Sequence, residues 1–387
     1  MSEMVFSLSQ AEFCAQPAPE PGDTPDNTCA DTRTERTLMR FSRTLNVVDA
    51  HAEAESGKVV IGGVGPVPGQ TMFDKMVHFE EHLDDLRKLL LCEPRGAVWH
   101  NANVVLPSNN PEADYGYIIL ESTEYPAMSG SNTMCVATVL LETGMLPMTE
   151  PATNLVLESP AGLIQIEATC ADGKVQRVRL VNQPAFVYHQ DAKIDVPGLG
   201  NIGVDVAYGG MTFAFVDAES IGLSLDVTQE ATLYDLGQRI KKAAAEQLDV
   251  SHPLNPLIPG ITNTSFTGPL LREAGPDGEQ MIRSVNAVIV SPGRLDRSPC
   301  GTGTSARLAL LHSRGELKAG QLFRHESIIG SQFDARIEEI VTVGPYEAVV
   351  PSISGSAWIT SFNQLVLDPS DPFQEGFVVG KPWKAEY

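Results

Sequence analysis

Two stretches of the sequence align without a gap: SGSNTMCVATVLLETGML, residues 129–146, and CGTGTSARLALLHSRGEL, residues 300–317. The second begins 171 residues after the first (300 − 129), which is close to half of the 387-residue chain. The identical pairs are Gly130 and Gly301, Thr133 and Thr304, Leu140 and Leu311, Gly144 and Gly315, and Leu146 and Leu317. A repeat at this spacing predicts two related halves, each with β-strands wrapped around one central helix.

The helix expected in each stretch is apolar on nearly every face, as the runs MCVATVLL and ARLALL show. A helix on a protein surface carries a single apolar stripe, so both of these helices are expected inside the protein. Short β-rich runs between turn residues, such as LNVVDAH, YGYIILES and TFAFVDA, make up most of the remaining chain. The predicted fold class is therefore α+β, with many strands and with helices at residues 73–91, 133–143, 233–247 and 304–313.

The composition is that of a globular protein with a strongly acidic balance. The chain has 49 Asp and Glu residues against 27 Lys and Arg residues, a formal net charge of −22. This charge repels phosphate backbones and anionic lipids, so neither nucleic acid nor a membrane is expected as a partner. No apolar run approaches the ~20 residues that span a bilayer, and the acidic, Pro-rich start differs from a secretory signal. We expect a cytoplasmic protein with a flexible extension over residues 1–40.

The six cysteines and eight histidines form no recognisable metal-ligand motif. There is no CxxC pair and no HExxH sequence, so neither a disulfide framework nor a bound metal is expected. GTGTSA, residues 301–306, has the form of a dinucleotide fingerprint. We reject that interpretation because the apolar strand before it ends at Val290, and because the aligned first loop has Asn132 in place of the second glycine. No cofactor is therefore expected.

Ser129 and Cys300 stand directly before the Gly-rich turns that open the two buried helices. Backbone N–H groups at a helix start lack intrahelical partners and point outward, which suits them to bind a carboxylate. The same positive helix end lowers the pKa of a nearby thiol, so Cys300 is expected to ionise readily. If the halves face each other, the two residues flank one ligand and can move a proton at the carbon next to its carboxylate. The N–H groups expected to hold that carboxylate are those of Gly130, Ser131, Gly301 and Thr302.

Asp296, four residues before Cys300, has two interpretations: it binds a cationic group of the ligand, or it caps a turn. Two other kinds of function also stay open. Cys300 could be an acyl-transfer nucleophile, which needs a histidine nearby, although neither His312 nor His325 lies in a recognisable motif. A non-catalytic binding protein could share the same fold.

Five segments carry a resemblance to a known family, and the first of them, around Cys300, is highly specific: DRSPCGTGTSARLALLHSRGEL, VVDAHAEAESGKVVIGGV, EPRG, VDVAYGGMTFAFVDA and ESIIGSQF. Through them, from about Leu45 to Phe377, the chain resembles the proline racemase family, which includes hydroxyproline 2-epimerases and trans-3-hydroxy-L-proline dehydratases. The resemblance implies a diaminopimelate-epimerase-like fold, in which two similar domains each wrap a barrel-like sheet around a buried helix. It also implies a cofactor-independent site between the domains. The expected domains are 41–203, joined by a C-terminal return at 355–387, and 204–354.

The chain departs from the family pattern at the first catalytic position. Racemases of the family carry a motif of the type MCGHGT there, and the aligned residues of this chain read MSGSNT. Ser129 therefore takes the place of the first catalytic cysteine, and Ser131 takes the place of the histidine. Members with a Ser and Cys pair resemble trans-3-hydroxy-L-proline dehydratases, 4-hydroxyproline 2-epimerases or enzymes with both activities, and proline racemase itself becomes a weaker candidate.

Ser129 and Cys300 differ in strength as bases, and this difference favours one of these activities over the other. Epimerisation asks each group to act in turn as base and as acid, which suits two groups of similar pKa. Dehydration needs one base at Cα and a proton donor for the departing hydroxyl. With Cys300 as the base and Ser129 as the donor, the sequence favours a trans-3-hydroxy-L-proline dehydratase that forms pyrroline-2-carboxylate, ahead of a 4-hydroxyproline 2-epimerase. The expected partner is a small proline derivative, and a homodimer stays open.

Overall fold

The computed structural model describes residues 41–379 except 257, 259 and 291–293. These residues belong to one compact unit, Arg40–Tyr387. The flexible extension expected over residues 1–40 lies outside the described residues. In the part of the chain that is described, no helix is long and apolar enough to cross a membrane.

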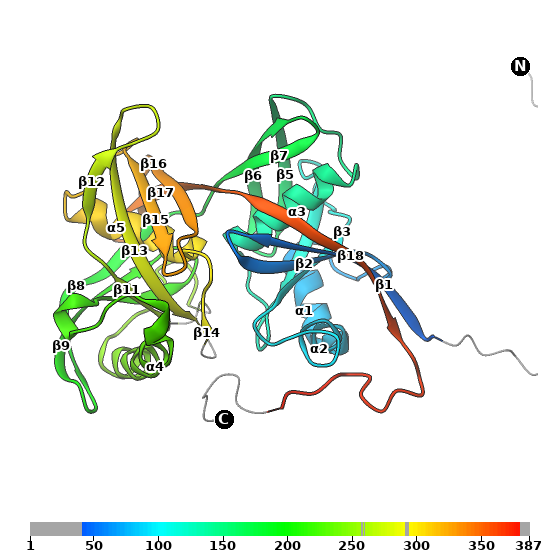
Figure 1. Ribbon diagram of the computed structural model, residues 1–387, viewed down its shortest axis with the longest axis horizontal. Helices are drawn as coiled ribbons and strands as arrows, with labels where there is room; N and C mark the ends of the chain where they lie inside the picture. Colours follow the sequence, from blue (N-terminus) through cyan, green and yellow to red (C-terminus); the bar gives the residue numbers. More distant parts are fainter. Residues whose placement is uncertain (1–40, 257, 259, 291–293, 380–387) are drawn as a thin grey trace, which may run out of the picture. The chain divides into compact units, whose positions relative to one another are not determined.

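The later part of the chain forms a ring of strands around helix α5 (Gly301–Ser313) (Figure 1). Its members, in the order of hydrogen-bonded neighbours, are β17 (Tyr346–Gly355), β8 (Ala185–Val196), β9 (Gly200–Tyr208), β10 (Thr212–Asp217), β11 (Ile261–Thr267), β13 (Gln280–Val290), β15 (Leu322–Ser327) and β16 (Gln332–Val343). β16 pairs again with β17, which closes the ring. Two short strands, β12 (Leu271–Ala274) and β14 (Arg294–Leu295), pair with β13.

The earlier part of the chain surrounds helix α3 (Gly130–Glu142) in a similar way. The neighbouring strands are, in order, β18 (Ala357–Leu367), β1 (Arg43–Ala52), β2 (Glu55–Gly62), β3 (Asn101–Leu106), β4 (Tyr115–Leu120), β5 (Ala152–Ser159), β6 (Gly162–Ala171) and β7 (Lys174–Val181). Figure 1 shows β18, from the far end of the chain, lying beside β1. The first and last described strands therefore belong to the same ring.

β17 connects the two rings. Its residues Ala348 and Val349 pair with β8 of the second ring, whereas its end, Ser352–Gly355, pairs with β7 of the first. The chain then continues into β18, which pairs with β1 along its length. Because one strand serves both rings, the domain limits at residues 203 and 354 remain a proposal.

The two central helices repeat each other in detail. They begin at Gly130 and Gly301 and have 13 residues each, so the 171-residue offset of the sequences is kept. Gly144 and Gly315 follow them with φ angles of 73° and 69°, the left-handed conformation in which glycine ends a helix. Both helices are almost wholly buried. The prediction of two strand-wrapped central helices is confirmed.

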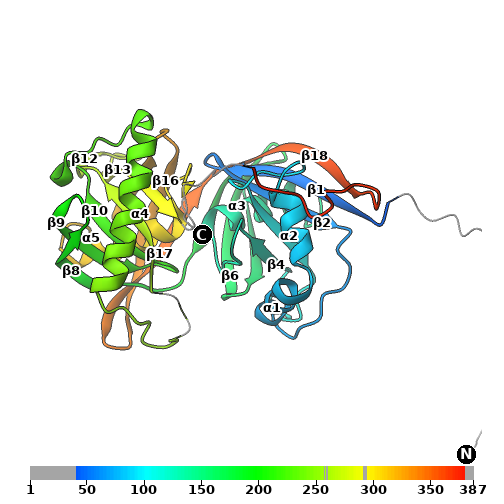
Figure 2. The same ribbon diagram turned by 90° about the horizontal axis from the view of Figure 1, so that it is seen from below.

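The remaining helices lie on the outside of the rings. Helix α4 (Glu230–Gln247) lies along the outside of the second ring (Figure 2). Its Leu233 and Ile240 belong to one core cluster with Phe266 and Ile289 of that ring. Two 3-10 turns, η1 (Glu219–Ile221) and η2 (Val227–Gln229), precede it. On the first ring lie α1 (Met72–His82) and α2 (Asp84–Leu91).

All four helix predictions need correction. Helices α3, α4 and α5 each begin three residues before the expected starts at 133, 233 and 304, and in α3 and α5 the buried glycines of the turn are the first helical residues. The single helix expected over 73–91 is broken at Leu83 into α1 and α2. The break lets both helices turn apolar side chains, such as Phe79 and Leu90, into one core.

Candidate active site

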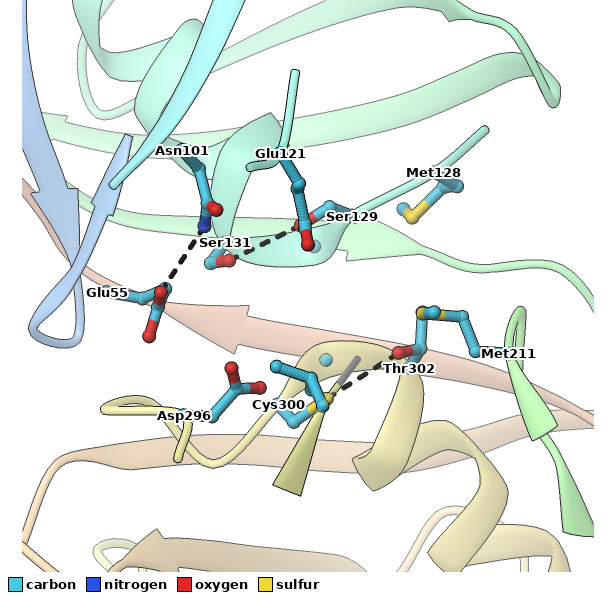
Figure 3. A pocket seen from close by; sticks show the side chains of 13 residues that line it. Glu55, Asn101, Glu121, Met128, Ser129, Ser131, Met211, Asp296, Cys300 and Thr302 are labelled. Atoms are coloured by element: carbon cyan, nitrogen blue, oxygen red, sulfur yellow. Dashed lines mark hydrogen bonds between the residues drawn. The ribbon is translucent and has the colours of Figure 1, made fainter. Parts of the chain in front are cut away.

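The starts of α3 and α5 line one cavity, together with residues from both rings (Figure 3). The residues selected from the sequence all lie at this cavity: Ser129, Gly130, Ser131, Asp296, Cys300, Gly301 and Thr302. The other residues that line it are Glu55, Asn101, Glu121, Met128, Met211 and Val290. The fold thus brings together the two loops that the sequence repeat had paired.

Gly130 and Gly301 allow the two helix starts to come into contact. A Cβ atom added to Gly301 would lie 3.2 Å from the Cα of Gly130, and one added to Gly130 would lie 3.5 Å from the Cα of Gly301. Neither of the residues before the helices, Ser129 and Cys300, caps its helix through its side chain. The N–H groups of both first turns are therefore available to a ligand, and two positive helix ends this close favour an anion between them.

Ser129 precedes α3 with an extended backbone, φ −149° and ψ 124°. Its Oγ accepts a hydrogen bond from Nδ2 of Asn132 at 3.0 Å and lies 3.4 Å from Oγ of Ser131. Both neighbours belong to the first turn of α3. The hydroxyl is therefore held at the cavity by the helix that it precedes.

Cys300 precedes α5 with a very different backbone, φ 66° and ψ 110°. A positive φ is strained for a residue with a side chain and costs roughly 1–3 kcal/mol. The Sγ atom lies 3.6 Å from Oγ1 of Thr302, and the Asp296 carboxyl stands beside it (Figure 3). This strained turn places the thiol, the most nucleophilic group of the cavity, next to a carboxyl group.

The pKa of the Cys300 thiol is raised well above its ordinary value, so the expectation of a lowered pKa was wrong. Burial is the main cause, and the negative charge of Asp296 is the second. The neighbouring Thr302 hydroxyl and Gly303 backbone N–H lower the pKa but are outweighed. The expectation considered the helix end alone, whereas removal of a thiolate from water beside a carboxylate has the larger effect. A ligand cation next to Asp296 would offset the second cause.

Arg294 gathers a buried cluster of carboxyl groups at the cavity. Its guanidinium pairs with Glu55 and donates to Oδ1 of Asn101 at 3.1 Å. Carboxyl oxygens of Glu121 and Asp296 each lie 3.7 Å from it. Burial, and then the charge of Glu55, raise the pKa of Asp296 to about 7, and burial raises the pKa of Glu121. Three carboxyl groups around one guanidinium favour a ligand that brings a further positive charge.

Sequence reasoning missed Arg294, Glu55, Asn101 and Glu121. Glu55 belongs to the segment VVDAHAEAES, in which His51 stacks on Trp358 with ring centroids 5.1 Å apart. The sequence does contain a pattern that could have identified three of them, because each is a carboxyl or amide residue at the end of an apolar strand. Glu55 begins β2, Asn101 begins β3 and Glu121 follows β4.

None of the described residues that line the cavity is a histidine. Of the two histidines considered as a base, His325 is buried with Nδ1 2.9 Å from Thr304 Oγ1, and Nε2 of His312 lies 3.7 Å from Glu347. A search of the described residues also finds no group of His, Cys, Asp and Glu side chains suited to hold a metal ion. The lining offers a hydroxyl, a thiol and carboxyl groups, which can exchange protons.

The family model described as proline racemase matches residues 47–378. The chain belongs to the proline racemase family. It is an enzyme of this family with a small-molecule substrate. The loop before α3 has Ser129 where the racemase motif MCGHGT has cysteine.

Two solved structures of the family resemble the chain over nearly its whole length. A hydroxyproline epimerase from Agrobacterium vitis, with trans-4-hydroxy-L-proline bound, is 40% identical, with 89% of this chain and 97% of that chain covered and a TM-score of 0.79. A probable proline racemase from Agrobacterium radiobacter K84, with carbonate bound, is 40% identical, with 88% and 98% covered and a TM-score of 0.77.

A more distant structure shares the fold alone. A phenazine biosynthesis protein of the PhzF family from Bacillus anthracis is 12% identical, with 83% of this chain and 99% of that chain covered and a TM-score of 0.52. The diaminopimelate-epimerase-like fold that the resemblance implied is confirmed.

Proposed function

We propose that the protein inverts the configuration of 4-hydroxyproline at Cα. The observation that carries the proposal is the position of Ser129 and Cys300, one from each ring, at a single cavity where two helix starts meet. Inversion at a carbon atom needs one proton-exchanging group on each of its faces. The two residues supply such groups without a cofactor.

The substrate carboxylate binds to N–H groups of the helix starts, and the ring ammonium binds Asp296. One of the two groups, Ser129 or Cys300, takes the proton from Cα, and the electron pair of the C–H bond moves toward the carboxylate. The helix starts stabilise the added negative charge there. The other group then gives its own proton to the opposite face. One proton leaves Cα and one arrives, so neither an oxidant nor a reductant is required.

Substrate binding itself helps Cys300 to ionise. The ammonium group lies beside Asp296 and offsets the negative charge that raises the pKa of the thiol. The thiolate therefore forms more readily in the complex than in the free enzyme. This step needs a substrate that carries a positive charge, as proline and its hydroxy derivatives do.

The ligand bound to a relative supports a hydroxyproline as the substrate, ahead of other imino acids. The Agrobacterium vitis epimerase, at 40% identity, holds trans-4-hydroxy-L-proline. This relative supports the epimerase more than the dehydratase, which the sequence alone had ranked first. The carboxyl groups around Arg294 suit the same substrate, because they can accept hydrogen bonds from both an ammonium and a hydroxyl group.

Dehydration of trans-3-hydroxy-L-proline is the second candidate, and the unequal pair of an alcohol and a thiol supports it. Here Cys300 takes the Cα proton, the electron pair of the C–H bond forms a Cα=Cβ double bond, and the C–O bond at Cβ breaks with its electrons on oxygen. Ser129 donates a proton to the departing hydroxide, which leaves as water. The cyclic enamine that remains tautomerises to pyrroline-2-carboxylate. The reaction uses Ser129 as an acid only, for which an alcohol is better suited than for the role of base.

Proton NMR in deuterated water tests both activities. Trans-4-hydroxy-L-proline, trans-3-hydroxy-L-proline and L-proline are incubated in parallel with chelator-treated enzyme and no added cofactor. We expect trans-4-hydroxy-L-proline to gain deuterium at Cα and to yield its 2-epimer. Pyrroline-2-carboxylate from the 3-hydroxy isomer, without epimer from the 4-hydroxy isomer, would replace the proposal by the second candidate. No deuterium at Cα of any of the three substrates, together with no pyrroline-2-carboxylate, would refute both.

A further inference from the structure

A chain of buried side-chain amides ends at Ser129. Nδ2 of Asn132 lies 3.0 Å from Oγ of Ser129, and Oδ1 of Asn132 lies 2.7 Å from Nδ2 of Asn103. The same Nδ2 of Asn103 lies 3.3 Å from the backbone carbonyl oxygen of Lys58. Asn132 and Asn103 are 1% and 0% exposed. This amide chain, made of the Lys58 carbonyl, Asn103 and Asn132, runs from β2 through β3 to the first turn of α3.

The Lys58 carbonyl sets the direction of every hydrogen bond in the amide chain. A carbonyl oxygen only accepts, so the atom of Asn103 that faces it is the NH2 group. That NH2 group also faces Asn132, which must therefore present its oxygen to Asn103 and its own NH2 group to Ser129. The Ser129 oxygen is an acceptor in this bond. Its proton must point elsewhere, toward the cavity or toward Ser131.

We propose that Asn132 and Asn103 are positioning residues, which direct the Ser129 proton away from the protein interior and stabilise the oxygen once that proton has left. This inference rests on the proposed function, in which Ser129 exchanges a proton with Cα. When Ser129 gives its proton to Cα, the O–H bond breaks and its electron pair stays on Oγ. The NH2 group of Asn132 then donates to an anionic oxygen, which is a stronger bond than that to a neutral hydroxyl. The amide chain thereby compensates for the weak acidity of an alcohol.

The corresponding position beside Cys300 carries no amide. Asn132 aligns with Gly303 in the repeat, and a Cβ atom added to Gly303 would lie 3.3 Å from Sγ of Cys300. The larger sulfur atom thus occupies space that a side chain at residue 303 would need. A thiol also has a pKa of about 8.5 in water, far below that of an alcohol, and needs less support to ionise. An amide therefore accompanies the hydroxyl, and a glycine accompanies the thiol.

Two substitutions of Asn132 remove the donor in different ways. Asn132→Asp keeps the shape but offers an oxygen that accepts the Ser129 proton and turns it away from the substrate. Asn132→Gly removes the donor without adding charge and reproduces the residue of the second loop. For both variants we expect kcat to fall roughly a hundredfold, as when one donor to a catalytic oxyanion is lost, with KM changed by less than about threefold.

A double-mutant cycle separates this role from a structural one. In the Ser129→Cys background, Asn132→Gly should cost less than about tenfold in kcat, because the thiol needs less support. A side chain that served only the stability of α3 would cost the same in both backgrounds.

Asn182 offers a matched control outside the cavity. Its Nδ2 lies 3.0 Å from Oγ of Ser305 in the middle of α5, and both side chains are buried. Asn182→Asp therefore places the same carboxyl group beside a buried serine. We expect it to keep kcat within about twofold of the wild type while it reports the stability cost of the substitution.

A measurement without substrate tests the hydrogen bond itself. In ¹⁵N-labelled enzyme, the side-chain amide signal of Asn132 is identified by its loss in Asn132→Gly. It should shift in Ser129→Ala and in Asn103→Ala, and it should stay in place in Asn182→Asp. An unchanged signal in Ser129→Ala, or kcat values above about a third of wild type in both Asn132 variants, would overturn the inference. If the wild type converts no proline derivative, the proposed function fails, and the amide signal alone decides whether the chain positions Ser129.

Discussion

The loops that carry Ser129 and Cys300 each precede the start of a buried helix, but they support their reactive groups differently. Ser129 is extended, with φ −149°, and accepts a hydrogen bond from Asn132. Cys300 has φ 66° and has Gly303 in the corresponding position. The helices behind the loops repeat in length and in their terminal glycines, so the scaffold does not account for the contrast. The difference teaches that each loop is adapted to the acidity of the group it holds.

In both loops, hydrogen bonds hold the backbone carbonyl of the residue before the helix, but the side chains behind that carbonyl differ. Thr133 and Thr304 each donate to the carbonyl of the residue before their helix, at 2.7 and 2.8 Å. A hydroxyl has one proton, so Tyr117 and His325, at 2.6 and 2.9 Å, must donate to these threonines. His325 thus carries its proton on Nδ1, and burial and the charge of Arg307 lower its pKa to about 3. A phenol and a neutral imidazole perform the same task.

The largest effect is expected from removal of the thiol in the second loop. Cys300→Ala removes the stronger base, so kcat should fall by at least roughly a thousandfold with the fold intact. Product formation and thermal unfolding are measured together. A folded variant that keeps more than a few per cent of the activity would exclude Cys300 as a base.

Substitution of Ser129 sharpens the contrast between the loops. Ser129→Ala should lose roughly a hundredfold or more in product formation, yet Cys300 can still exchange the Cα proton of the isomer it faces. With each epimer supplied separately, proton NMR in deuterated water should therefore show deuterium in one of the two epimers, without conversion to the other. Loss of exchange together with turnover would mean that Cys300 does not work alone on its face.

Ser129→Cys makes the two loops chemically alike. Two thiols of similar pKa suit epimerisation, so the ratio of 4-hydroxyproline epimerisation to 3-hydroxyproline dehydration should rise. The ratio is measured with both substrates at equal concentration. If it does not change, pocket residues other than the two proton-exchanging groups determine the choice of reaction.

The contact between the helix starts predicts a smaller effect on binding. Gly301→Ala puts a methyl group 3.2 Å from the Gly130 backbone, whereas Gly130→Ala meets an ordinary contact of 3.5 Å. Gly301→Ala should therefore raise KM roughly tenfold and Gly130→Ala should raise it less, because the starts must separate to accept the methyl group. Equal KM values for both variants would show that this spacing does not control carboxylate binding.

The buried cluster predicts a dependence of stability on pH. The pKa of Asp296 is raised from 3.8 to about 7, so the folded protein keeps a proton that the unfolded chain has released. The contribution of Asp296 to the free energy of unfolding is therefore full at low pH and is lost as the pH rises from about 4 to about 7. Asp296→Asn cannot ionise, so its stability relative to the wild type should increase across this window in urea titrations. A constant difference would contradict the raised pKa.

The smallest expected effect concerns the backbone of the two loops. Because Cys300 has a positive φ, Cys300→Gly should be more stable than Cys300→Ala by about 1 kcal/mol. At the extended Ser129, which is the N-cap of α3, neither substitution relieves backbone strain, so the difference between Ser129→Gly and Ser129→Ala should be smaller. Denaturant unfolding of the four variants gives both differences. Equal differences at both positions would show that the backbone contrast does not affect stability.

Much of the fold and of the site was predictable from local pattern. The 171-residue repeat and the all-round apolar helices led to two strand-wrapped helices, and the Gly-rich turns led to the seven selected residues at the cavity. Helix breaks were less predictable, as Leu83 shows, because the core that the two helices share decides where they turn. The preference for dehydratase came from comparing two functional groups in isolation, and the epimerase relative reverses that order.

The sequence by itself determined which groups meet, because a repeated helix start places its loop in the same way in each ring. Only the tertiary structure decided how those groups behave. The buried cluster joins Arg294 to Glu55, which lies 239 positions away, and the amide chain behind Ser129 draws on three separate elements. The raised pKa of Cys300 follows from burial and from Asp296, neither of which a motif records. Proton affinity depends on solvent exclusion and on the charges packed around a group, and these exist only after distant segments have folded together.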